Sequence, residues 1–162
     1  MATFQLKIAK ADISDAAEIL SLQKLAFQTE AEIYGKEIRP LQEGLPEAQA
    51  AFAQNAILKA TSSGKRIVGS VRGRMLDDGH TCHVGRLMVH PEFRRRGIAK
   101  ALLLALEKEM PDASRFQLFT GALSVNNIKL YKSVGYQEFE KEQLVKDGEA
   151  PLVFLEKKRI KF

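Results

Sequence analysis

The segment from 81 to 121 constrains the fold more than any other part of the chain. Its pattern predicts a strand at 81–90, an amphipathic helix at 96–109 and a short buried strand at 116–121. The helix has a wide apolar stripe and is stopped by Pro111. Because a strand–helix–strand unit crosses over a sheet, the two strands are expected to be parallel and the helix to lie on the sheet.

The rest of the pattern predicts an α/β fold, with one mixed central β-sheet flanked by helices. Turn signals in SSGK and DDGH separate three strand-like runs, which indicates an antiparallel meander that ends in the strand at 81–90. The other expected elements are a strand at 3–9, a helix from Asp12 to about 28, a loop or broken helix at 33–47, a short helix at 46–54, strands at 56–61 and 65–76, a helix at 125–135, and two closing strands at 136–145 and 151–158.

Length and composition are typical of one globular domain covering 1–162. The chain has 162 residues, of which 45% are apolar and 28% charged. No apolar run approaches the roughly 20 residues that span a bilayer, and the first residues lack the apolar core of a secretory signal. We therefore expect a cytoplasmic protein that does not bind a membrane.

Cysteine and histidine are too sparse to predict a metal site or an internal disulfide. The chain has one cysteine, Cys82, and three histidines without helical i, i+4 spacing. Cys82 precedes His83, but neighbours in a strand point to opposite faces and do not easily touch. Cys82 is therefore expected to be a buried filler thiol rather than a nucleophile.

The turn between the strand at 81–90 and the following helix is predicted to bind an anion. The start of a helix presents unpaired backbone N–H groups, and Gly97 lets a phosphate approach the backbone closely. The arginines at 94–96 would add charge-assisted hydrogen bonds, although a solvated basic turn is the alternative. The chain lacks both GxxxxGK[ST] and a GxGxxG after a strand, so neither a P-loop nor a dinucleotide site is supported.

The spacing of Arg94, Gly97 and Ala99 after the V-H-P strand exit resembles the acetyl-CoA signature of the GCN5-related N-acetyltransferase (GNAT) family. Downstream, the segment VNNIKLYKSVGY resembles the family's helix that carries a tyrosine, here Tyr131, and ends in Gly-Tyr or Gly-Phe. The element order also fits from 3 to 158. The resemblance implies the GNAT fold and a single N-acetyltransferase domain.

In the family, the central strand bulges and parts from its parallel neighbour, which opens a cleft for the pantetheine arm. Carried over, Leu87 to Val89 hold the pantetheine and the N–H groups of 95–100 surround the pyrophosphate. Tyr131 matches the tyrosine that protonates the departing thiolate, although a core aromatic is the alternative. Many members have asparagine where this chain has Ser124. The implied cofactor-binding residues are Leu87, Met88, Val89, Arg94, Arg95, Arg96, Gly97, Ile98, Ala99, Lys100, Asn127 and Tyr131.

The resemblance implies direct transfer of acetyl from acetyl-CoA to a primary amine in a ternary complex without a metal. The acceptor could be a small amine, a peptide N-terminus or a protein lysine. No residue identifies itself as the base that deprotonates the amine. His83, His90, Glu32 and Glu92 are candidates, and a non-catalytic role is favoured for both histidines.

Two other function classes stay open. The fold could retain the cofactor cradle to sense acetyl-CoA or to bind a partner, without catalysis. The net charge of +5 also allows nucleic-acid binding, but no aromatic residues alternate with the arginines, so no nucleic-acid partner is expected. A homodimer is compatible with the sequence, which does not specify the oligomeric state or the acceptor.

Overall fold

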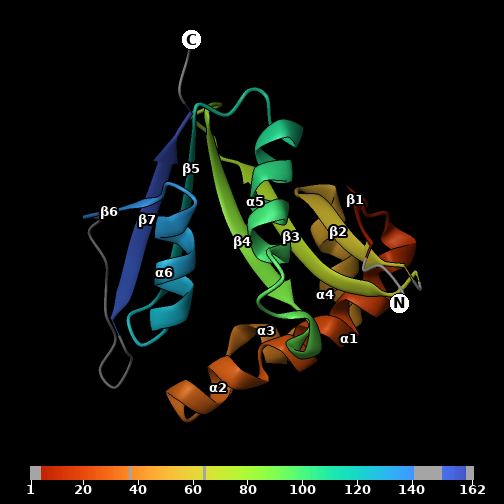
Figure 1. Cartoon of the computed structure of the whole chain (residues 1–162). Coiled ribbons are helices and arrows are strands. Elements are labelled where there is room, and N and C mark those ends of the chain that lie inside the picture. Colours follow the sequence, from red (N-terminus) through yellow and green to blue (C-terminus); the bar gives the residue numbers. More distant parts are fainter. Residues whose placement is uncertain (1–4, 37, 64, 141–150, 160–162) are drawn as a thin grey trace.

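The computed structural model describes residues 5–36, 38–63, 65–140 and 151–159. These form one seven-stranded sheet in the order β1-β2-β3-β4-β5-β7-β6, with helices on both faces (Figure 1). The strands are β1 (Leu6–Lys10), β2 (Ala56–Ser62), β3 (Ile67–Met75), β4 (Thr81–Val89), β5 (Arg115–Gly121), β6 (Gln137–Phe139) and β7 (Leu152–Lys158). The helices are α1 (Ala16–Ala26), α2 (Gln28–Tyr34), α3 (Arg39–Gln42), α4 (Leu45–Ala50), α5 (Ile98–Glu109) and α6 (Val125–Ser133), with short 3₁₀ turns η1 (Ile13–Asp15), η2 (Ala51–Ala53) and η3 (Pro91–Phe93).

The strand pairing confirms the predicted topology. Strands β1 to β4 form an antiparallel meander, and β4 pairs with β5 in parallel across the α5 crossover. Strand β7 is antiparallel to β6, as expected of the closing pair, and it lies between β5 and β6. Parts of two predicted strands, at 3–4 and 141–145, lie outside the described residues.

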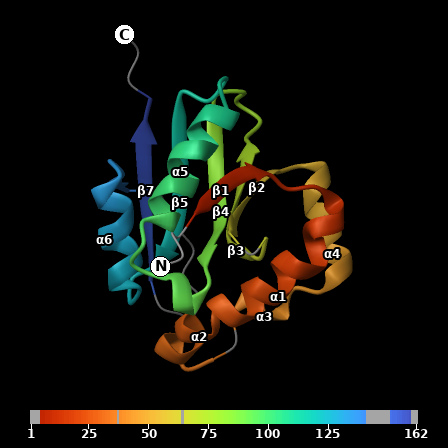
Figure 2. The same cartoon turned by 45° about the vertical axis from the view of Figure 1, so that its right-hand side comes forward.

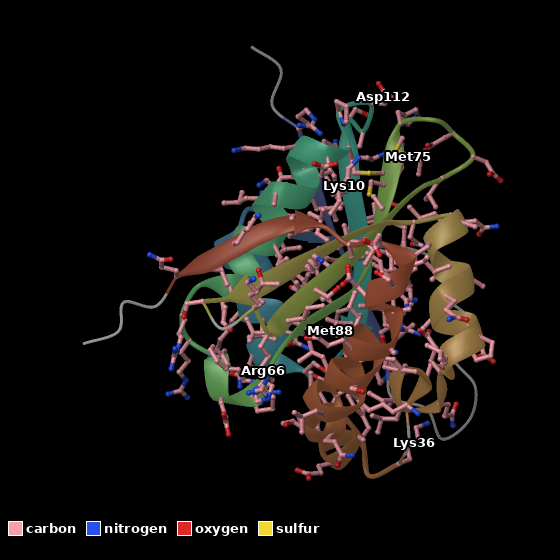
Figure 3. The ribbon with its side chains drawn as sticks, turned by 90° about the vertical axis from the view of Figure 1, so that its right-hand side faces the viewer. Lys10, Lys36, Arg66, Met75, Met88 and Asp112 are labelled. Atoms are coloured by element: carbon pink, nitrogen blue, oxygen red, sulfur yellow. The ribbon has the colours of Figure 1, made fainter. Side chains whose placement is uncertain are left out.

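Two layers of helices enclose the sheet. Helices α5 and α6 lie on one face, whereas α1 to α4 lie on the other side, with α2 at the end of the sheet where β4 stops (Figures 1 and 2). Gly73 in β3 lets α5 approach closely, because a Cβ there would stand 2.8 Å from the Leu106 Cδ1 atom. On the opposite face, Met88 packs with Ile19 and Leu22 between α1 and the sheet (Figure 3).

The segment after α1 differs from the sequence prediction in detail. The predicted helix to about 28 ends at Ala26, and α2 follows directly. The loop or broken helix expected at 33–47 contains the end of α2, the short α3 and the start of α4. Gly35 ends α2 with a left-handed φ of 67°, and Pro40 lies in the first turn of α3. The residues that indicated a loop therefore mark helix ends.

An ionic cluster ties the α3–α4 connection to the sheet. The Glu43 carboxylate accepts hydrogen bonds from Arg72 Nη2 at 2.5 Å and Arg86 Nη2 at 3.1 Å. The Glu43 side chain is only 11% exposed, so it is largely removed from water. This burial raises the pKa of Glu43, but the hydrogen bonds and charges of Arg72 and Arg86 outweigh it and hold the pKa below its usual value.

We expect Glu43→Gln to lower the free energy of unfolding by about 1.5–3 kcal/mol at pH 7, the range for hydrogen bonds to charged groups. Because the folded pKa of Glu43 is lowered, its contribution is present above the unfolded pKa of about 4.3 and is lost as the pH falls through the folded value. Urea unfolding at pH 7, 5 and 3 measures the difference.

Glu109→Gln is the matched control. Glu109 pairs with Lys10, whose side chain is 72% exposed, so its loss should change the unfolding free energy by less than about 1 kcal/mol. An equal effect of both variants, or a Glu43→Gln effect that persists at pH 3, would contradict the stabilising role of the cluster.

Candidate functional site

Strands β4 and β5 pair over only part of their length. The parallel ladder joins 81–83 to 115–117 and stops there. Beyond it, β4 stays paired with β3 to Val89, and β5 stays paired with β7 to Gly121. The separation affects only the facing edges of β4 and β5. Figure 1 shows the two strands diverging below the ladder. The sheet thus opens internally.

A β-bulge in β4 accompanies this opening. Arg72 of β3 pairs with Gly85, whereas Ser70 pairs with Met88, so β4 has one extra residue in this interval. Arg86 lies in the bulge with a left-handed φ of 49°. The bulge and separation that the family resemblance implied for the central strand are both confirmed.

The turn from β4 to α5 presents backbone N–H groups at the end of the opening. Arg95 has a left-handed φ of 64° and Gly97 one of 77°, so α5 begins at Ile98 rather than at 96 as predicted. The Ala101 N–H makes the first helical bond, to the Gly97 carbonyl at 3.0 Å. A Cβ at Gly97 would meet no atom within 4 Å. The turn therefore has the shape of an anion cradle.

These elements surround a cleft of about 750 Å³. It is lined by residues of the α1–α2 junction, the end of β4, the start of α5 and the start of α6. Eleven of the twelve predicted cofactor-binding residues line it: Leu87, Met88, Val89, Arg94, Arg95, Gly97, Ile98, Ala99, Lys100, Asn127 and Tyr131. The structure thus brings together residues from two sequence motifs more than twenty positions apart.

The arginines of the turn have different environments. Arg94 donates from Nη2 to the Ala26 carbonyl at 3.1 Å and from Nη1 to Thr29 Oγ1 at 3.4 Å. Its guanidinium therefore links the turn to the end of α1 and the start of α2. Arg96 does not line the cleft, because its guanidinium stacks over the Phe93 ring at 5.0 Å from the centroid. Arg95 is exposed at the cleft.

Tyr131 is buried on α6 and lines the cleft. Its ring packs edge to face against Tyr136, with the centroids 5.8 Å apart. Burial raises the pKa of the Tyr131 phenol, and the negative charge of Glu30 raises it further. The phenol therefore keeps its proton at neutral pH.

A hydrogen-bonded network that the sequence did not reveal joins α2 to the start of α6. The Glu30 carboxylate accepts from Ser124 Oγ and from Asn127 Nδ2, both at 2.7 Å. The Tyr34 hydroxyl lies 2.7 Å from Ser124 Oγ and occupies the place where a Cβ of Gly121 would stand. Glu30 lies on a short helix without a local motif, so only the contact with residues over ninety positions away identifies it.

Other candidates from the sequence lie outside the cleft lining: His83, His90, Glu32 and Glu92. His90 is buried, with Arg66 Nη2 at 2.7 Å from its Nε2 and the Glu92 N–H donating to its Nδ1 (Figure 3 labels Arg66). Burial and the charge of Arg66 lower the pKa of His90, which favours the neutral ring. Cys82 is buried outside the cleft lining, as expected of a filler thiol, and burial raises its pKa to about 11.

Two further features of the described residues bear on the site. No helix among them is long and apolar enough to cross a membrane. Nor does this part of the chain bring three His, Cys, Asp or Glu side chains together in a group that could hold a metal ion.

Sequence comparison finds relatives of this chain, and some of them are acetyltransferases by name. The chain is 34% identical over 127 residues, 77% of its length, to the UPF0157 protein YqkA of Bacillus subtilis. It is 34% identical over 82 residues, 48% of its length, to the catalytic subunit NAA20 of the N-terminal acetyltransferase B complex of Arabidopsis thaliana. The matches span only 35% and 47% of those two proteins, so the chain corresponds to part of each.

Comparison of folds finds similar solved structures at low sequence identity. The PaiA N-acetyltransferase of Thermoplasma acidophilum, solved in complex with coenzyme A, superposes with a TM-score of 0.80 at 15% identity. The match covers 96% of this chain and 99% of that one, so the two share the fold over nearly their whole lengths.

The model of the acetyltransferase (GNAT) family matches residues 17–136, which include the bulged strand, the turn at Gly97 and the helix that carries Tyr131. The chain belongs to the GNAT family of acetyltransferases.

Proposed function

We propose that this protein transfers the acetyl group of acetyl-CoA to a primary amine by direct attack in a ternary complex. The observation that carries the proposal is the opening between β4 and β5, which leads to the N–H groups at the start of α5. An extended molecule with amides along its length and phosphates at one end fits this combination. Acetyl-CoA is such a molecule.

The β4 edge supplies backbone groups for the pantetheine arm. From Val84 to Val89 the side of β4 that faces β5 is outside the parallel ladder, so its N–H and C=O groups can pair with amides as an added strand would. The pyrophosphate would then lie at Gly97 and the first N–H groups of α5. The arginines assist, with Arg95 exposed toward the ligand and Arg94 holding the turn in place.

The reaction forms an N–C bond between the amine and the acetyl carbonyl carbon and breaks the C–S bond of the thioester. Charge that develops on the carbonyl oxygen would be stabilised by a backbone N–H between Leu87 and Val89. The departing thiolate takes a proton from the Tyr131 phenol, whose pKa is raised by burial. The amine must lose a proton to a base.

The proposal is tested by screening small alkylamines, peptides with free N-termini and lysine-containing peptides against acetyl-CoA, with thiol release as the readout. We expect release to depend on both the enzyme and the amine. Acetyl-CoA binding without amine-dependent release across the panel would overturn the catalytic proposal and favour an acetyl-CoA sensor.

Tyr131→Phe should lower kcat by about 10²-fold or more, because it removes the acid that protonates the thiolate. The dissociation constant of acetyl-CoA, measured by calorimetry, should change by less than about threefold. Since burial and Glu30 raise the pKa of Tyr131, the wild-type kcat should show no alkaline decline from Tyr131 ionisation up to pH 9.

Tyr136→Phe is the control for that variant. It removes the same hydroxyl from a buried ring in contact with Tyr131 that does not line the cleft. We expect kcat to stay near the wild-type value in Tyr136→Phe. Equal kcat in the two variants would show that the Tyr131 hydroxyl has no role in the chemical step.

Gly97→Val should weaken acetyl-CoA binding by about 100-fold, because it places a branched side chain in the open space of the cradle at a left-handed φ. Arg95→Ala should weaken binding by only about three- to tenfold, the loss of one exposed charged contact. Calorimetric titration with CoA measures both effects.

Gly79→Val controls for backbone strain alone. Gly79 has the same φ of 77°, also with no atom within 4 Å of a Cβ, and it lies in the β3–β4 turn outside the cleft. It should lower stability as Gly97→Val does but leave CoA affinity unchanged. Equal affinity losses in Gly97→Val and Arg95→Ala would contradict a backbone cradle.

A further inference from the structure

Glu30 is the one carboxylate among the described residues that line the cleft. The cations that line it, Arg94, Arg95 and Lys100, all come from the turn and the first residues of α5. Glu30 comes from α2 and contacts the start of α6. The cleft therefore combines basic groups suited to phosphates with a single acidic group that phosphates would avoid.

Neutral donors hold the Glu30 carboxylate. Its two oxygens accept from the Ser124 hydroxyl and the Asn127 amide, and no ion pair in the described part of the chain includes it. An ionised carboxylate only accepts hydrogen bonds, so Ser124 gives its one proton to Glu30 and accepts from the Tyr34 hydroxyl. This arrangement fixes the carboxylate in place without neutralising its charge.

The carboxylate also has room for another donor. Two carboxylate oxygens offer about four lone-pair positions, and the described contacts use one on each oxygen. An ammonium group carries three N–H donors and a full positive charge, so it matches a fixed, uncompensated carboxylate better than a neutral amine does.

We propose that Glu30 binds the ammonium group of the acceptor and takes the proton that the nitrogen must lose before it attacks the thioester. This inference rests on the proposed function. One N–H bond of the ammonium breaks, its proton moves to the Glu30 carboxylate, and the freed lone pair forms the N–C bond. As the C–S bond breaks, the thiolate takes the Tyr131 proton and the nitrogen loses a second proton, which restores the phenol; Glu30 releases its own proton to water. The acceptor class is an alkylamine that is protonated at neutral pH, with a pKa of about 8 to 10.4, rather than a weakly basic arylamine.

Glu30 and Tyr131 then have opposite roles in one cleft. Burial and the Glu30 charge raise the pKa of Tyr131, which keeps this acid protonated beside the base. The Tyr34 hydroxyl faces Glu30 through the Ser124 hydroxyl, and the Arg94 guanidinium bonds Thr29, which precedes Glu30 in α2. The proton accepted by Glu30 and the proton donated by Tyr131 are therefore different protons.

The test is Glu30→Gln, which keeps the size of the side chain and removes the charge. At pH 7, kcat/KM for an alkylamine accepted by the wild type should fall about 10²-fold, while the Kd of acetyl-CoA changes by less than about threefold. As the pH approaches the pKa of the amine, the nitrogen is already neutral and no longer needs an anion or a base. The difference between variant and wild type should therefore narrow toward pH 10.

Two other variants make this result specific. Glu32→Gln removes an exposed carboxylate from the same helix outside the cleft, and it should match the wild type at every pH. Glu30→Asp keeps the charge on a shorter side chain and should recover part of the activity at pH 7. A loss in both Glu30→Gln and Glu30→Asp that does not vary with pH would assign Glu30 a structural role and overturn the inference.

The remaining outcomes separate this inference from the proposed function. An active wild type with an equally active Glu30→Gln overturns the inference alone. Loss of acetyl-CoA binding in Glu30→Gln also overturns it, because the carboxylate would then order the cofactor site. A wild type that binds acetyl-CoA but releases no thiol with any amine refutes the proposed function, and the role of Glu30 with it.

Discussion

The early end of the β4–β5 ladder is the constraint on which the rest of the site depends. A buried strand cannot leave its N–H and C=O groups without hydrogen-bond partners. Where a sheet opens internally, the separated strand edges therefore need other groups to pair with. The ladder ends at His83, yet β4 continues to Val89 along β3. The unpaired edge of β4 can therefore accept an added strand, and the turn at Gly97 places the start of α5 at the end of this edge.

The bulge that shapes this edge depends on contacts outside the cleft. Arg86 has a left-handed backbone, which is unfavourable for a residue with a Cβ and persists only when its surroundings hold it. Its guanidinium pairs with Glu43, which also binds Arg72 on the neighbouring strand. The connection between α3 and α4 thus supports the geometry of β4, so the stability of the fold and the shape of the cleft are coupled.

The helices and strands at 56–135 could be predicted from the sequence because their signals are local and mutually consistent. Alternating strands, turn residues and the apolar stripe of 96–109 all predict one meander and one crossover. The helices at 28–50 were less predictable, because they are short and their ends, such as Gly35 and Pro40, also occur in loops. Glu30 was missed for a related reason: its partners Ser124 and Asn127 meet it only in the folded chain.

Contacts that form only in the folded chain also change the interpretation of the basic turn at 94–96. In the sequence, the three arginines are expected to assist the backbone N–H groups of the turn, and Arg94 stands at the fixed basic position of the motif. In the structure, its guanidinium bonds the Ala26 carbonyl at the end of α1, where the helix dipole is negative. A phosphate would have to compete with that carbonyl and with Thr29. The N–H groups at the start of α5 have no partner within the helix and face no such competition, and a Cβ at Gly97 would stand in open space. The backbone at this left-handed glycine, rather than the charge of Arg94, is therefore the feature of this turn best suited to hold the anion.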